Sequence, residues 1–90
     1  MKPSTIFERW IKANSARLEA EDAEFKHLVT SVAFYLDMIE MNEEMSPGAA
    51  ESAVHLLQRF TAEAGAKGYQ LPDVTMPKIK IVKPTNREQR

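Results

Sequence analysis

Apolar residues recur along the first half of the chain at a helical period. From residue 4 to residue 46 there is no proline or glycine, and the segment is rich in residues that favour helices. Its apolar positions repeat at intervals of seven, at Ile11, Leu18, Phe25, Val32 and Ile39. This period predicts a helix and not a strand. Thr5 and Glu8 have the spacing of a capping box, so we expect the helix to begin near Thr5.

The predicted first helix is long for so short a chain. One helix over residues 5–43 would extend about 58 Å at about 1.5 Å per residue, whereas a compact chain of 90 residues has a radius of gyration of about 12 Å. The helix therefore either breaks near Asn14 and Ser15 or projects beyond its own core. Neither residue is followed by Glu or Gln three positions on, as a new capping box would require. We therefore expect the helix to be continuous.

A second helix is predicted after a short turn. Ser46 suits the N-cap and Pro47 the first helical position. An apolar stripe follows at Ala50, Ala53, Val54, Leu57, Phe60 and Ala64, and Gly65 and Gly68 are candidates for the end of the helix. Because the turn is short, we expect helices over 26–43 and 47–64 to pack as an antiparallel hairpin. The second helix is too short to cover the N-terminal end of a straight first helix.

The C-terminal segment has a different character. Pro72, Pro77 and Pro84 exclude a helix through residues 69–90, and residues 78–82 alternate as in a short β-strand. A lone strand cannot satisfy its own backbone groups. The segment therefore pairs with another chain, stays an extended arm, or runs back along the uncovered half of the first helix. The predicted organisation is an all-α protein, with a helical hairpin domain at 1–68 and an extended basic arm at 69–90 carrying at most one short strand.

Charge and composition narrow the class of protein. Residues 1–70 carry 7 Lys/Arg and 11 Asp/Glu, whereas residues 71–90 carry 5 and 2, so an acidic body precedes a basic arm. There is no cysteine, which excludes disulfides and thiol chemistry. The sequence has no apolar run of membrane-spanning length and no signal-peptide core. We expect a cytoplasmic protein without membrane contact.

Candidate catalytic and metal-binding patterns are weak. Glu24 and His27 match the Glu-x-x-His spacing of di-metal carboxylate bundles, and Glu51 and His55 share a helix face. Further inward-facing glutamates cannot be placed, so exposed histidines are the simpler interpretation. The acidic residues around Glu21 are typical of a solvated helix face. We therefore predict no catalytic residue, no metal and no cofactor.

Two apolar clusters need an explanation beyond the hairpin. Phe7, Trp10 and Ile11 lie one helical turn apart, and Trp is frequent in binding hot spots. They either bind a partner or pack under the returning arm. A stripe of methionines at positions 38, 41 and 45 is more typical of core than of an adaptable docking surface.

These features favour a non-enzymatic protein-binding module, which would act as an adaptor, regulator or inhibitor of a larger complex. The candidate partner-binding residues are Phe7, Trp10, Ile11, Lys78, Ile79, Lys80, Ile81 and Lys83. The hairpin is expected to leave some apolar surface exposed. We therefore predict that the protein self-associates, in the simplest case as a homodimer. One alternative is a nucleic-acid-associated protein whose basic tail contacts phosphates. Another is a small scaffold or assembly chaperone.

Overall fold

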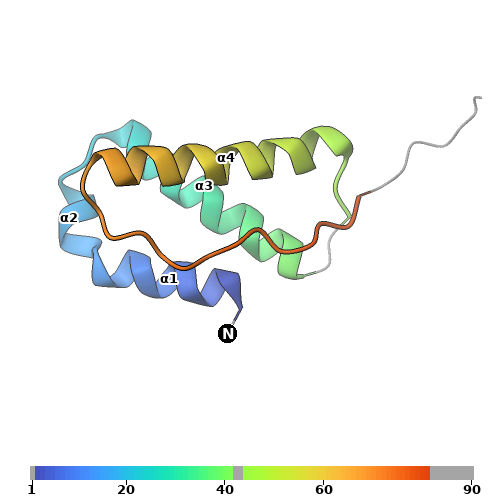
Figure 1. Ribbon diagram of the computed structural model, residues 1–90, viewed down its shortest axis with the longest axis horizontal. Coiled ribbons are helices and arrows are strands. Elements are labelled where there is room, and N and C mark those ends of the chain that lie inside the picture. Colours follow the sequence, from blue (N-terminus) through green and yellow to red (C-terminus); the bar gives the residue numbers. More distant parts are fainter. Residues whose placement is uncertain (1, 42–43, 82–90) are drawn as a thin grey trace, which may run out of the picture.

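The described residues form four helices, followed by an extended segment of the arm over 69–81. The computed structural model describes residues 2–41 and 44–81. The helices are α1 (Pro3–Ala13), α2 (Ser15–Glu19), α3 (Ala23–Glu40) and α4 (Pro47–Ala66). α3 packs against both α1 and α4, and α4 runs back beside α3 after a short connection (Figure 1). The all-α class predicted from the sequence is therefore confirmed.

The prediction of one continuous first helix was wrong, because residues 3–40 form three helices. The first break is at Asn14, whose side-chain Nδ2 donates a hydrogen bond to the carbonyl of Trp10 at 2.8 Å. Asparagine side chains compete in this way with the helical backbone. The second break precedes Asp22, whose carboxylate caps α3 by accepting a hydrogen bond from the Phe25 amide at 2.8 Å. The two breaks turn α1 back onto α3.

The start of α1 also differs from the predicted capping box. The helix begins at Pro3, and neither Thr5 nor Glu8 caps it. Its first turn is capped instead by the Glu40 carboxylate at the far end of α3, which accepts hydrogen bonds from the amide and the hydroxyl of Ser4. A carboxylate is well placed at a helix N-terminus, where amide groups lack intrahelical partners. This contact also fastens α1 against α3.

Aromatic side chains from three helices and the arm form the centre of the core. Phe60 of α4 lies with its ring 5.0 Å from Phe7 and 5.1 Å from Trp10, both of α1. Tyr69 of the arm lies 5.4 Å from Trp10 and 5.7 Å from Phe25 of α3. Edge-to-face and offset pairs of this kind add stabilisation beyond the apolar area that they bury. The helices and the arm thus share one core.

The arm lies along its own chain, across the face between α1 and α4 (Figure 1). Near its start, the Trp10 indole donates a hydrogen bond from Nε1 to the Gln70 carbonyl at 2.6 Å. Val74 and Met76 pack against the core further along. Near its end, the Met45 amide donates to the Lys80 carbonyl at 2.9 Å, within an isolated bridge. Of the three arrangements considered for the arm, the described residues adopt the one that runs back over α1.

The methionine stripe is only partly core. Met45 is buried and Met38 is half-buried, but Met41 is 70% exposed. Met41 lies just past the end of α3, on the side of the helix that faces solvent. The prediction that this stripe belongs to the core therefore holds for Met45 and is wrong for Met41.

We expect Trp10→Ala to lower the free energy of unfolding by about 3–5 kcal/mol, because it removes a large buried ring from the core. Trp10→Phe keeps a ring but leaves the Gln70 carbonyl without its donor, so a loss of about 1–3 kcal/mol is expected. Urea denaturation measures both. The matched control is the exposed neighbour in Arg9→Ala, which should stay within about 0.5 kcal/mol of the wild type. Equal stabilities of all four proteins would contradict this description of the core.

Candidate functional site

The predicted aromatic site lies inside the molecule. Phe7 and Trp10 are buried in the core, and Ile11 is half-buried against it. The arm covers this cluster, which is the second of the two roles that the sequence left open for it. A partner reaches these side chains in the described conformation only by displacing the arm.

The predicted arm residues divide between core and surface. Ile79 packs with Met45 in a small apolar cluster at the far end of the molecule. Lys78 and Lys80 are exposed, and the Lys80 Nζ lies 3.6 Å from a carboxylate oxygen of Glu44. Ile81 is 46% exposed. Lys83 lies outside the described residues.

A polar cluster that the sequence did not predict holds the start of the arm. The Glu21 carboxylate accepts hydrogen bonds from Lys67 Nζ and from the Tyr69 hydroxyl, each at 2.9 Å. The Arg17 guanidinium lies 3.9 Å from the centre of the Tyr69 ring and donates to the Lys67 carbonyl. Gly68, at φ 88°, makes the turn between α4 and the arm. The loop between α2 and α3 is thereby tied to the end of α4.

The hydrogen bonds of this cluster shift the protonation of its members. Those from Lys67 and Tyr69 lower the pKa of Glu21 below its ordinary value of 4.5. The same contact with Glu21 raises the pKa of Lys67. Burial, followed by the hydrogen bond to Glu21, raises the pKa of Tyr69. The charged carboxylate is therefore the form that holds the arm.

The two glutamate–histidine pairs line different but adjoining depressions, which share Tyr35 and Leu56. Glu24 and His27 line one depression between α3 and α4, and Glu51 and His55 line another. Within residues 2–41 and 44–81, no group of three or more His, Asp or Glu side chains is arranged to hold a metal ion.

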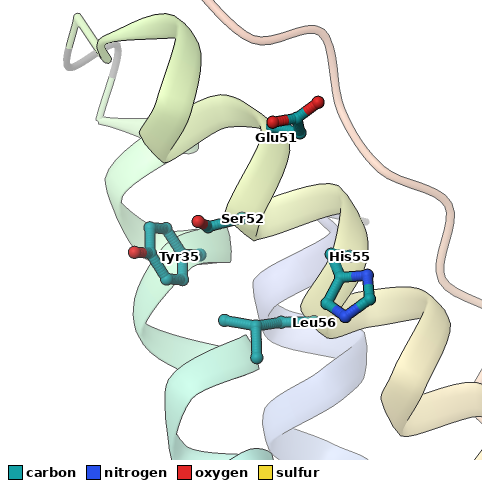
Figure 2. A pocket seen from close by; sticks show the side chains of 5 residues that line it. All are labelled: Tyr35, Glu51, Ser52, His55 and Leu56. Carbon is teal, nitrogen blue, oxygen red and sulfur yellow. The ribbon is translucent and has the colours of Figure 1, made fainter.

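α4 has an exposed ridge with a hollow on each side of it. Figure 2 shows the hollow of about 540 Å³ toward α3, where Tyr35 faces Ser52 and Leu56. The hollow on the other side, about 460 Å³, lies between α4 and the arm, and its lining is mainly apolar. Glu51 and His55 line both hollows, so they form the crest of the ridge. Both hollows are wide open to solvent.

The residues of the ridge were only partly visible in the sequence. Glu51 and His55 drew attention as a pair on one helix face, and Val54 as part of the predicted apolar stripe, whereas Ser52 and Gln58 gave no signal. The second hollow exists because the arm returns along α4 and places Ile79 and Ile81 opposite Val54. These residues are about 25 positions apart in the sequence. Their contact depends on the path of the arm, which the sequence alone left open.

Comparison with known proteins identifies no relative. No family model, no curated protein and no solved structure matches this chain. No helix in the described part of the chain has the length and apolar character needed to cross a membrane.

We expect Glu21→Gln to lower the melting temperature at neutral pH, because it removes the charged acceptor for Lys67 and Tyr69. Since the folded pKa of Glu21 is lowered, its contribution is present above pH 4.5 and disappears as the pH falls through the folded value. The difference in melting temperature between wild type and variant should therefore shrink on acidification. Thermal unfolding followed by circular dichroism at several pH values measures it, with the exposed Glu19→Gln as control. A difference that is constant with pH would contradict this role of the carboxylate.

Proposed function

We propose that this protein is a non-enzymatic binding module that docks another protein across the ridge of α4. The observation that carries the proposal is the pair of open hollows on either side of Glu51 and His55. A partner bound there would contact α4 on both sides of Glu51 and His55. The module would then serve as an adaptor, regulator or inhibitor of the protein that it binds.

The shape of the ridge favours a macromolecule over a small ligand. Small-molecule sites enclose most of the ligand surface, whereas these hollows are open and lie on opposite sides of one helix. A protein surface that projects two apolar side chains can fill both at once. Peptide-binding modules commonly combine such apolar pockets with a helix or strand of the partner.

The chemistry of the lining is that of an interface. Val54 is 38% and Ile81 46% exposed, and they face the same hollow together with Pro47 and Ile79. Apolar side chains in a depression bordered by polar groups are typical of contact surfaces. The carboxylate of Glu51 and the imidazole of His55 stand between the two apolar areas, where they offer an acceptor and a hydrogen-bonding ring.

Two variants that add the same charge to exposed positions of α4 test the proposal. Val54→Lys places an ammonium group inside the hollow, whereas Ala62→Lys places it on α4 outside both hollows. We expect the immobilised full-length wild type to retain a protein from cell extract that Ala62→Lys also retains. Val54→Lys should lose it. With the purified partner, calorimetry should show a dissociation constant raised at least about 10-fold for Val54→Lys.

Three results would contradict the proposal. They are retention of no protein by the wild type, equal retention by both lysine variants, and loss of the retained material on nuclease treatment. The last result would favour the nucleic-acid alternative, for which binding should fall steeply with salt. Circular dichroism of both variants checks that the helices are intact.

A further inference from the structure

The solvent-facing side of α3 carries a regular seam. Six positions at alternating intervals of four and three are all exposed, namely Ala23, His27, Thr30, Phe34, Asp37 and Met41. This is the spacing at which one helix packs along another in a coiled coil. α1 and α4 pack against the opposite side of α3, so the described chain leaves the seam open.

The seam contains the two most exposed large apolar side chains of the described residues. Phe34 is 59% and Met41 70% exposed, and they lie two helical turns apart. The ring of Phe34 has an aromatic neighbour in Tyr35, at 5.8 Å, but most of its surface faces solvent. Burial of these two side chains in an interface would be favourable by the hydrophobic effect.

Two opposite charges at the seam can pair with those of a second copy when the second helix runs antiparallel. Asp37 is one of the six seam positions, and Lys26 flanks the seam on the side nearer to Asp37. Both are exposed, and they are 11 residues or about 16 Å apart. Neither forms an ion pair within the described part of the chain. If a second copy of α3 packs antiparallel, with the midpoint between residues 31 and 32, Lys26 meets the partner's Asp37. Two-fold symmetry repeats that pair at the other end.

We infer that α3 pairs with α3 of a second copy of this chain in an antiparallel homodimer. In this register Phe34 lies over the hole between His27, Thr30 and Ser31 of the partner subunit. Met41 reaches the partner's Ala23. In a parallel arrangement the two Lys26 side chains would lie on opposite sides of the interface and could not pair with Asp37. Asp37, which lies in the seam, would then face the partner's Asp37, which is repulsive. The charges thus favour one orientation.

The composition of the seam sets the strength of the dimer. Burial of the Asp37 carboxylate without a partner would be unfavourable. In the antiparallel register the ammonium group of the partner's Lys26 compensates its charge. Polar residues in such a seam fix register and orientation at a cost in stability. A single helix face also buries little area in comparison with the standard interface of about 1,600 Å². The dimer is therefore weak and reversible. It does not depend on the partner site proposed on α4, because the two surfaces share no residue.

Sedimentation equilibrium of the full chain, from micromolar to millimolar concentration, tests the inference. The wild type should dimerise within this range, and Phe34→Ala should weaken the dimer at least about 10-fold. Leu71→Ala is the matched control, since Leu71 is 40% exposed on the arm and lies away from the seam. It should leave the dimer unchanged.

Charge reversal tests the antiparallel register itself. Lys26→Asp and Asp37→Lys should each weaken the dimer, because each creates two like-charge contacts across the interface. The double variant restores both pairs with their signs exchanged, so it should recover most of the wild-type affinity. All these positions are exposed, and circular dichroism should show unchanged helices.

The inference is overturned by a wild type that stays monomeric throughout, as it would if the seam served only a different protein. It is overturned equally by a dimer that Phe34→Ala does not affect. A double variant as weak as the single ones would exclude the antiparallel register.

Discussion

The indole of Trp10 needs an apolar environment and a hydrogen-bond acceptor at the same time, and the arm supplies both. Tyr69 covers the ring from one side, and the carbonyl of the next residue, Gln70, accepts the indole N–H at 2.6 Å. A buried N–H without an acceptor would be unfavourable by about 1–3 kcal/mol. The aromatic core can therefore be buried at low cost only when the arm lies in this position. The described residues form three helices of eleven residues or more, and the arm closes the core that these helices leave open.

The breaks in the N-terminal half of the chain follow from the same requirement. A straight helix would hold Phe7 and Trp10 away from Phe60, and the breaks at Asn14 and before Asp22 return α1 to the core. Each break loses helical hydrogen bonds, and each is partly compensated locally by a side-chain bond of Asn14 or Asp22. The larger compensation is tertiary, since the aromatic side chains bury most of their surface only after α1 has turned back.

The parts of the fold that depend on neighbouring residues could be predicted from the sequence. Ser46 caps α4 by accepting the Ala49 amide, and Pro47 opens the helix, as their sequence indicates. Gly68 takes the positive φ expected near a helix end. The start of α1 could not be found in this way, because its cap comes from Glu40, which is 36 residues from Ser4. Glu21 likewise depends on Lys67 and Tyr69, which only the folded chain brings within reach.

The same distinction explains why the candidate site moved. From the sequence, the Trp10 cluster could either bind a partner or pack under the returning arm, and the arm could either pair with another chain or fold back. In the structure they satisfy one another, so neither has to be covered by a second molecule. Large apolar side chains remain exposed in two areas, at Phe34 and Met41 on α3 and at Val54 of α4 beside Ile81 of the arm. These two areas lie on different helices and share no residue. Pairing through α3 would leave both copies of the α4 ridge open, and a weak dimer would then present two equivalent binding sites to one larger partner, which increases avidity without any new contact.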